Sequence, residues 1–154
     1  MTDGPLAVVA PVAGRVVALA DVPDPVFAGQ LVGAGVAIEP DTAGGATTVV
    51  SPVAGALVKV HPHAFVVVGP DGRGLLVHVG IDTVKLDGRG FELLAAEGDA
   101  VEQGAPVVRF DPEVVAEAGF SAVCPVVVLD SPADSVEQAA VGRTVSVGDA
   151  LFTA

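Results

Sequence analysis

Two histidines, His63 and His78, are the side chains of this sequence best suited to chemistry, and they lie fifteen positions apart. A neutral imidazole can act as a nucleophile, move a proton or bind a metal ion. The run 77–83 around the second histidine contains Asp82 as its only acid, with no serine and no pair of carboxylates. The pattern leaves three interpretations open: a phosphoryl group carried on an imidazole, a metal site, or two histidines without a role.

The relative position of these histidines depends on a predicted β-hairpin. Two β-prone runs, 63–68 and 74–79, are separated by a turn-forming stretch that contains Asp71-Gly72. A turn centred on that dipeptide makes the two imidazoles diagonal neighbours on one face of the sheet, and a register two residues away sets them directly opposite. A shift by one residue would instead place them on opposite faces. A close pair therefore requires one of two registers.

The composition indicates an all-β protein. The 154-residue chain is 51% hydrophobic, mainly through Val and Ala, and 19 Gly and 12 Pro interrupt its apolar runs at short intervals. Short Val-rich runs bounded by Gly and Pro are typical of β-strands. The length suits one domain with a full-sized core. We therefore predict a single domain over residues 1–154, folded as an antiparallel β-sandwich or barrel.

Internal repeats add detail to that prediction. The tetrapeptide Pro-Val-Ala-Gly occurs at 11–14 and again at 52–55, and residues 98–107 resemble 142–151. Two copies of each unit suggest a duplicated hairpin motif, because a solenoid would show more repeats.

The remaining elements are expected to be short. A helical turn is predicted after Asp111-Pro112, where an N-cap residue precedes a proline, and a second turn within 131–140. Residues 41–46 are predicted to form a loop. Strands are expected at 6–9, 14–20, 30–38, 47–50, 56–60, 63–68, 74–79, 84–87, 106–110, 124–129, 144–146 and 150–153.

Charge and hydropathy exclude several classes of protein. The net charge of −12 argues against nucleic-acid binding, which needs Lys and Arg, and favours partners with a basic docking face. The apolar runs are far shorter than the roughly 18 residues of a membrane span, and the first residues lack the basic segment of a secretory signal. We therefore expect a cytoplasmic protein without direct membrane insertion. The single cysteine, Cys124, precedes a proline and a valine run, which favours a buried structural residue.

The segments around the histidines resemble a known family. The run His-Val-Gly-Ile-Asp-Thr at 78–83, the run Asp-Val-Pro-Asp at 21–24 and the two Pro-Val-Ala-Gly copies are similar to the glucose-type enzyme IIA of the bacterial phosphoenolpyruvate:sugar phosphotransferase system, in the family's order. The resemblance covers nearly all of residues 6–154. It implies a β-sandwich with duplicated hairpins and a shallow apolar depression as the active site.

The resemblance also implies roles for individual residues. His78 would be phosphorylated through Nε2, and His63 would hydrogen-bond the phosphoryl oxygens. Two positions depart from the family pattern: His61 stands where a threonine commonly orients the first histidine, and Lys85 stands where an acid is often found. The residues expected to meet partner proteins are an apolar rim and the acids that face an arginine of the phosphoryl donor: Phe27, Val32, Val84, Asp24 and Asp82.

The function implied by the resemblance is that of a phosphotransferase component, which relays a phosphoryl group and is not a stand-alone enzyme. It would accept the group from the histidine-containing phosphocarrier protein and pass it to the cysteine of a sugar-specific enzyme IIB in a IIB/IIC permease. The relay itself requires no cofactor. Family relatives also regulate permeases or kinases, sometimes with a zinc ion shared between a partner's carboxylate and the residues that match His63 and His78. The sugar is left open.

Two other classes of protein share parts of the pattern. A zinc endopeptidase of the lysostaphin type would use His61, His63, His78 and Asp82 as a zinc site. In that class, however, His-x-His follows His-x-Gly-x-Asp, whereas here it comes first. A biotinyl or lipoyl carrier is suggested by the run 97–104, but the lysine that such a domain needs on a tight turn is missing.

Overall fold

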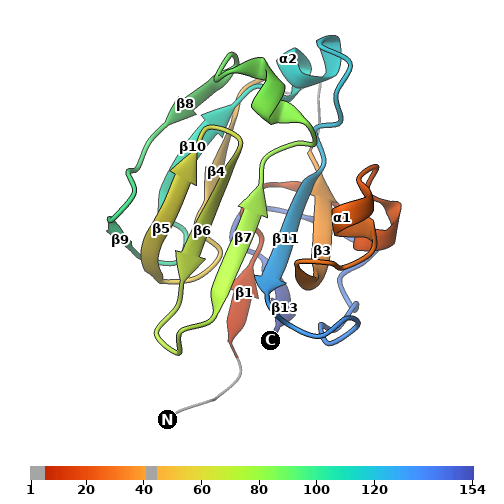
Figure 1. Cartoon of the computed structure of the whole chain (residues 1–154), viewed down its shortest axis with the longest axis vertical. Helices are drawn as coiled ribbons and strands as arrows, with labels where there is room; N and C mark the ends of the chain where they lie inside the picture. The colour runs from red at the N-terminus through yellow and green to blue at the C-terminus, as the bar shows by residue number, and fades with distance from the viewer. Residues whose placement is uncertain (1–5, 41–44) are drawn as a thin grey trace.

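The computed structural model describes residues 6–40 and 45–154, which form β-strands connected by turns and short helices (Figure 1). The strands are β1 (Ala7–Val9), β2 (Gly14–Ala18), β3 (Gly33–Glu39), β4 (Thr47–Val50), β5 (Gly55–His61), β6 (Ala64–Val68), β7 (Gly74–His78), β8 (Phe91–Leu93), β9 (Ala100–Val101), β10 (Pro106–Phe110), β11 (Cys124–Leu129), β12 (Thr144–Val145) and β13 (Ala150–Thr153). The helices are α1 (Pro25–Ala28) and α2 (Pro112–Glu117), with 3-10 helices η1 (Leu19–Asp21) and η2 (Thr83–Leu86).

Three antiparallel sheets make up the fold. The largest has eight strands in the order β12-β2-β3-β11-β7-β6-β5-β9, the second has three in the order β4-β10-β8, and β1 pairs with β13. The large sheet curls, and strands of the smaller sheets lie behind it in Figure 1. All three sheets contribute side chains to one main hydrophobic core. The predicted antiparallel all-β fold with short helices is confirmed.

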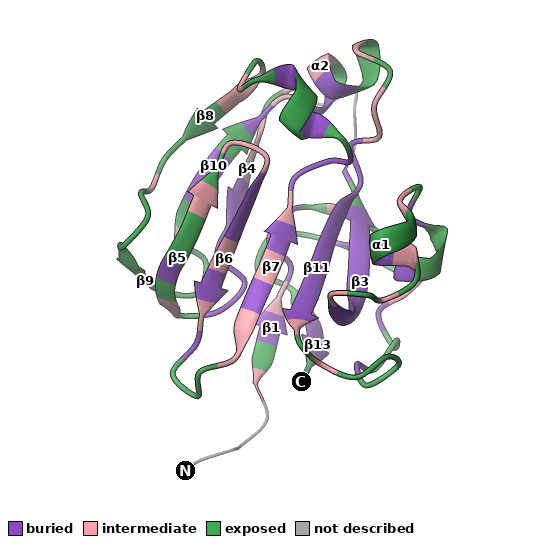
Figure 2. Cartoon of the chain, in the orientation of Figure 1, coloured by how far each residue is buried: buried purple, intermediate pink, exposed green. Residues whose placement is uncertain are grey.

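The large sheet carries apolar side chains on both faces. Successive residues of a strand point to opposite sides, so on β7 Val77 enters the main core while Leu76 packs against a second cluster. On β11, Val126 and Val127 divide in the same way. The second cluster is completed by residues of the η1–α1 segment, which covers the outer face of the sheet. As a result, β3 and β11 are buried along nearly their whole length (Figure 2).

The two Pro-Val-Ala-Gly copies lie side by side and bond reciprocally. The Val50 N–H donates to the Pro11 carbonyl at 2.8 Å, and the Val9 N–H donates to the Pro52 carbonyl at 3.1 Å. Each copy leads directly into a strand of the large sheet, β2 or β5. The sequence repeat therefore forms two equivalent segments that lead into strands, and backbone groups of each segment hydrogen-bond to the other.

Local predictions had mixed outcomes. α2 begins after Asp111, whose Oδ1 accepts a hydrogen bond from the Glu113 N–H at 3.0 Å, as the N-cap pattern predicted. The strand expected at 84–87 is wrong, because η2 occupies this segment. Asp82 and Asp87 bracket η2 with φ values of 61° and 52°, and such left-handed residues interrupt an extended chain.

Other elements were not predicted, and one predicted loop falls outside the described residues. β8, β9, α1 and η1 were not predicted, and the segment 131–140 contains turns without a helix. The loop expected at 41–46 falls largely outside the described residues. No helix in the described ranges is long and apolar enough to cross a membrane.

The hairpin that carries the histidines differs from both predicted registers. β6 and β7 pair Ala64 with His78. The connecting loop closes with a hydrogen bond from the Gly69 N–H to the Arg73 carbonyl at 2.9 Å, and Gly72 within it has a φ of 84°. Such a three-residue loop, with a left-handed residue in its last position, shifts the pairing by one residue relative to a two-residue turn. In a regular hairpin this shift would send the two histidines to opposite faces.

Candidate functional site

His78 is the last residue of β7, and it shares the outer face of the large sheet with Leu76. The covering η1–α1 segment makes this face partly apolar. Phe27 of α1 is buried, and its ring centroid lies 5.2 Å from that of His78 with the ring planes 60° apart. The imidazole is therefore half-buried against an aromatic edge.

His63 reaches the same place from a turn. Pro62 and His63 connect β5 to β6, and His61 pairs with Ala64 on either side of them. A turn residue does not follow the alternation of strand side chains, so the ring of His63 can approach His78 despite the one-residue shift. The two ring centroids are 5.5 Å apart with planes at 65°. The imidazoles are neighbours, as expected, but the turn brings them together and not the predicted register.

The hydrogen bonding of His78 fixes which ring nitrogen carries the proton. Its Nδ1 lies 2.5 Å from the Gly80 carbonyl oxygen. A carbonyl only accepts hydrogen bonds, so Nδ1 must carry the proton. In a neutral ring, Nε2 then holds the free lone pair. This local geometry leaves Nε2 as the nitrogen able to act as a nucleophile, independently of the family resemblance.

Burial sets the charge of His78. The pKa of its imidazole is lowered mainly by burial, which disfavours the charged form. The hydrogen bond to Gly80 and the charges of Asp24 and Asp82 act in the opposite direction, but they do not overcome the burial. The ring is consequently neutral at pH 7, the state that a nucleophile requires.

The pKa of His63 is also lowered, first by burial and then by the neighbouring His78 and His61 rings. Among the described residues, neither ring nitrogen of His63 has a hydrogen-bond partner. His61 instead stacks on it, with centroids 5.5 Å apart and planes at 18°. His63 thus lies between two other imidazoles and is held by ring contacts. The sequence showed His61 as a departure from the family but gave no sign of this stacking.

The apolar residues expected to meet partners differ in exposure. Val84 in η2 is 59% exposed, whereas Val32 is half-buried and Phe27 is only 7% exposed. Val32 and Phe27 both belong to the second cluster. Leu31, which sequence reasoning missed, is 73% exposed and is the most exposed large apolar side chain among the described residues. Val84 and Leu31 therefore present apolar surface, and Phe27 contacts His78.

The two predicted acids sit at the ends of short helices. Asp24 caps α1: its Oδ1 accepts hydrogen bonds from the Val26 N–H at 2.9 Å and the Phe27 N–H at 3.4 Å. This cap positions the helix that places Phe27 against His78. Asp82 is exposed and directly precedes η2. Both carboxylates lie close enough to His78 to raise its pKa.

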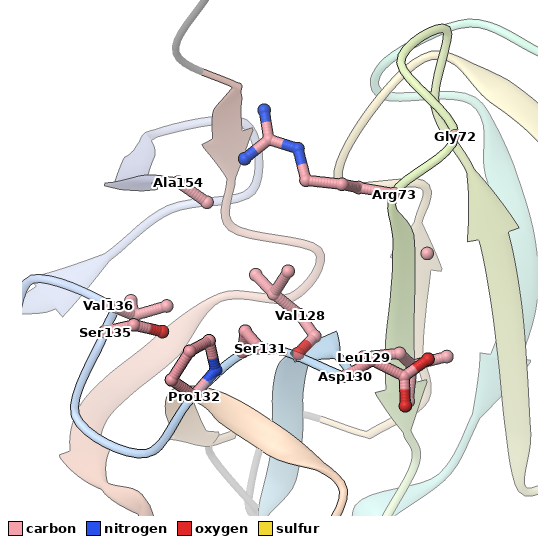
Figure 3. A pocket seen from close by; sticks show the side chains of 11 residues that line it. Gly72, Arg73, Val128, Leu129, Asp130, Ser131, Pro132, Ser135, Val136 and Ala154 are labelled. Atoms are coloured by element: carbon pink, nitrogen blue, oxygen red, sulfur yellow. Dashed lines mark hydrogen bonds between the residues drawn. The ribbon is translucent and has the colours of Figure 1, made fainter. Parts of the chain in front are cut away.

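A sizeable hollow lies away from the histidines. Its volume is about 500 Å³, and it is lined by the β6–β7 loop around Arg73 and by the segment after β11 that includes Ser131 and Pro132 (Figure 3). The histidines lie at the other end of β6 and β7. A smaller hollow of about 220 Å³ adjoins the histidines, between the His61–His63 turn and η2. The histidines therefore lie at a shallow part of the surface and not in the larger hollow.

The described residues contain no group of three or more His, Cys, Asp or Glu side chains arranged to hold a metal ion. A catalytic zinc site typically takes three protein ligands, so the set of His61, His63, His78 and Asp82 does not form the site of a zinc peptidase. That hypothesis has no support.

Comparisons with known proteins identify one family and its fold. The family model described as phosphoenolpyruvate-dependent sugar phosphotransferase system, EIIA 1, matches residues 6–133. A Bacillus anthracis protein named PTS system glucose-specific EIIA component is 41% identical over 143 residues, covering 92% of this chain and 84% of the relative. A Staphylococcus aureus protein of the same name is 43% identical over 128 residues, covering 82% and 75%. The solved structure of glucose permease IIA from Mycoplasma capricolum superposes with a TM-score of 0.88 at 33% identity, covering 98% and 96% of the two chains.

Proposed function

This chain belongs to the EIIA 1 family of the phosphoenolpyruvate-dependent sugar phosphotransferase system, and from that premise we propose that it carries the phosphoryl group on Nε2 of His78. The observation that supports this assignment is the hydrogen bond between Nδ1 and the Gly80 carbonyl, which leaves Nε2 as the nitrogen with a free lone pair. Components of this family are phosphocarriers that relay the group between proteins. Catalysis then consists of positioning and of stabilising charge.

Phosphoryl transfer to His78 exchanges one P–N bond for another. The Nε2 lone pair attacks the phosphorus of a donor phosphohistidine, a P–N bond forms to His78, and the electron pair of the broken P–N bond returns to the donor's nitrogen. Because Nδ1 keeps its proton, the phosphorylated ring carries a positive charge, and the Gly80 carbonyl stabilises that charge. A positively charged ring leaves as a neutral imidazole when the next acceptor attacks. The same hydrogen bond thus serves both acceptance and release.

His63 supplies the charge that the resting site lacks. In the unphosphorylated protein its pKa is lowered, so the ring is neutral. A phosphoryl group on a ring whose centroid is 5.5 Å away brings negative charge next to His63, and a nearby opposite charge favours protonation. His63 then donates a hydrogen bond to a phosphoryl oxygen and stabilises the group until transfer.

The partners follow from the relay. We propose the histidine-containing phosphocarrier protein as donor and the cysteine of a sugar-specific enzyme IIB, in a IIB/IIC permease, as acceptor, with all steps in the cytoplasm. The exposed Val84 lines the hollow beside His63, and the two acids Asp24 and Asp82 lie near His78, an arrangement that suits an apolar docking face with a basic partner residue. Val32 and Phe27 support that face from beneath. The relatives are named as glucose-specific, and we extend glucose to this chain as the proposed sugar.

The cofactor assignment is part of the proposal. The relay needs no bound cofactor, since both bonds made and broken are P–N or P–S bonds to side chains. Regulation of permeases or kinases through a shared zinc would require ligands beyond His63 and His78, and a partner would have to supply them.

The test is phosphorylation with labelled phosphoenolpyruvate and the two general phosphotransferase proteins. We expect one phosphoryl group per chain, located on His78 by mass spectrometry under alkaline conditions, which preserve phosphoramidates. His78→Ala should abolish the labelling because His78 is the only imidazole of the described residues whose Nδ1 is held by a backbone carbonyl. Labelling of the His78→Ala protein at the wild-type rate would refute the assignment.

A further inference from the structure

The carbonyl that sets the tautomer of His78 belongs to a turn that is held from below by a buried hydroxyl. Thr83 is 1% exposed, and its Oγ1 donates a hydrogen bond of 2.7 Å to the Val79 carbonyl. The carbonyl of Val79 and the N–H of Gly80 form one rigid peptide unit. The hydroxyl of Thr83 therefore fixes the plane that immediately precedes the Gly80 carbonyl.

The other side of the same peptide is also occupied. The Gly80 N–H interacts with the sulfur of Cys124, which is fully buried and whose pKa burial raises to about 12, so it stays a neutral thiol. The thiol lies 3.4 Å from the Ala122 carbonyl, to which it donates. One peptide is thus contacted by a hydroxyl at its carbonyl and by a thiol at its N–H. Cys124 was expected to be structural, and this contact shows which structure it supports.

The following peptide is held at both ends as well. The Ile81 N–H donates to the Ser121 carbonyl at 2.9 Å, and the Gly80 carbonyl on the same peptide accepts from His78 Nδ1. Hydrogen bonds at the two ends of one peptide polarise each other and strengthen the acceptor. The direction of the Gly80 carbonyl is therefore defined by contacts on two successive peptides.

Thr83 also packs directly against Gly80. A Cβ built on Gly80 would lie 2.5 Å from the Thr83 methyl carbon, and Gly80 has a φ of 80°. The methyl group of Thr83 thus fills the space that the absent side chain leaves. A valine would fill this space equally well, because valine and threonine have the same shape. Only the bond to the Val79 carbonyl distinguishes the hydroxyl, and a buried hydroxyl is costly without such a partner.

We propose that Thr83 is a positioning residue for phosphoryl transfer: its hydroxyl holds the Val79–Gly80 peptide so that the Gly80 carbonyl stays on Nδ1 of His78 and Nε2 remains unprotonated. This inference rests on the proposed role of His78 and adds a residue that touches neither the phosphoryl group nor the reacting nitrogen. Thr83 acts through two successive peptides, with Cys124 supporting the first of them.

The experiment compares Thr83→Val, which keeps the shape and removes the hydroxyl, with Thr83→Ser, which keeps the hydroxyl and removes the methyl. Imidazole ¹⁵N spectra of the unphosphorylated proteins report the tautomer of His78. We expect wild type and Thr83→Ser to show Nδ1–H alone, and Thr83→Val to show both tautomers. The rate of phosphorylation of Thr83→Val should fall about five-fold, as expected from the loss of one net hydrogen bond.

A matched control is available at the other buried hydroxyl of the described residues. Ser51 is fully buried and donates to the Val53 carbonyl at 2.7 Å. Ser51→Ala removes a bond of the same kind, so it should lower thermal stability similarly while it leaves the His78 tautomer and the phosphorylation rate unchanged. This control separates positioning from a general loss of stability.

Several outcomes would overturn the proposal. A folded Thr83→Val protein with Nδ1–H alone and a wild-type rate would reject it. If Thr83→Val does not fold, a folded Thr83→Ser protein with mixed tautomers would reject it, because the hydroxyl would then not suffice. The tautomer measurement needs no phosphoryl donor. A tautomer shift in Thr83→Val combined with no labelling of His78 in wild type would keep the positioning role and reject the proposed function.

Discussion

The turn after β7 and the turn between β5 and β6 each present one imidazole to the site, but they hold it differently. His78 has one ring nitrogen on the Gly80 carbonyl and an aromatic edge against its face. His63 has ring contacts with His61 and His78, and no hydrogen bond to its ring nitrogens among the described residues. The two turns are joined by one backbone bond, from the Val79 N–H to the His63 carbonyl.

This difference suits the two chemical tasks that we propose for these residues. A nucleophile must present the same nitrogen in every cycle, so a fixed tautomer is an advantage for His78. A residue that stabilises a transient negative charge must gain and lose a proton during the cycle. Ring stacking holds His63 in place without committing either of its nitrogens. The comparison predicts that changes at the two turns have different kinetic signatures.

The largest effect is expected from His63→Gln. Glutamine can hydrogen-bond a phosphoryl oxygen but cannot become a cation, so the protein should still accept phosphate from the donor. Onward transfer to the enzyme IIB cysteine should slow by about 100-fold, the lower range for loss of one proton-transferring group. Single-turnover measurements of each half-reaction separate the two steps. Normal sugar phosphorylation by this variant would remove His63 from the mechanism.

The next effect is expected from Gly80→Ala. A Cβ at this position would clash with Thr83 at 2.5 Å and would impose a left-handed conformation on alanine. The variant should lose about 1–3 kcal/mol of unfolding free energy and should accept phosphate more slowly, because the carbonyl on Nδ1 moves. Urea denaturation and the acceptance rate test this together. Gly72→Ala, also at positive φ but with nothing within 4 Å of its Cβ, is the control, and it should lose stability without loss of rate.

A smaller effect is expected from His61→Ala. Removing the stacked ring forfeits about 0.5–1.5 kcal/mol of ring contact, so onward transfer should slow by roughly two- to ten-fold with acceptance unchanged. His61→Phe restores a flat ring without a titratable nitrogen and should recover the rate. An equal loss in both variants would show that His61 acts through its charge and not through stacking.

The smallest expected effect is a change in how strongly thermal stability depends on pH. The pKa values of His63 and His78 are lowered in the folded protein, so the unfolded chain binds protons first as the pH falls through about 6.5. The stability that the neutral rings provide is therefore complete above pH 6.5 and is lost toward lower pH. Thermal unfolding at pH 7.5 and pH 5.5 should show a smaller loss for His63→Gln and His78→Gln than for wild type. An unchanged loss in both variants would contradict the lowered pKa values.

Much of the fold could be predicted from local patterns in the sequence. Val-rich runs between Gly and Pro predicted eleven of the observed strands approximately and one strand that is absent, because such runs favour burial on a pleated sheet wherever they occur. The Asp111-Pro112 pair located α2 for an equally local reason, the cap of its first turn. β8 and β9 were missed because they contain only three and two residues and neither belongs to a Val-rich run. α1 is only four residues long, and its apolar face is defined by the sheet that it covers.

The sequence by itself determined the residue types, the two repeated segments that lead into strands and the proximity of two histidines to turns. The tertiary structure decided how those histidines meet. A three-residue loop shifted the β6–β7 register by one residue. His63 lies in a tight turn, where side chains do not alternate between the two faces of the sheet, so the shift does not separate it from His78. Register and side-chain direction depend on which backbone groups pair across strands. The same holds for the nitrogen that we propose to react, since the Gly80 carbonyl on Nδ1 of His78 belongs to a turn that Thr83, Cys124 and Ser121 contact.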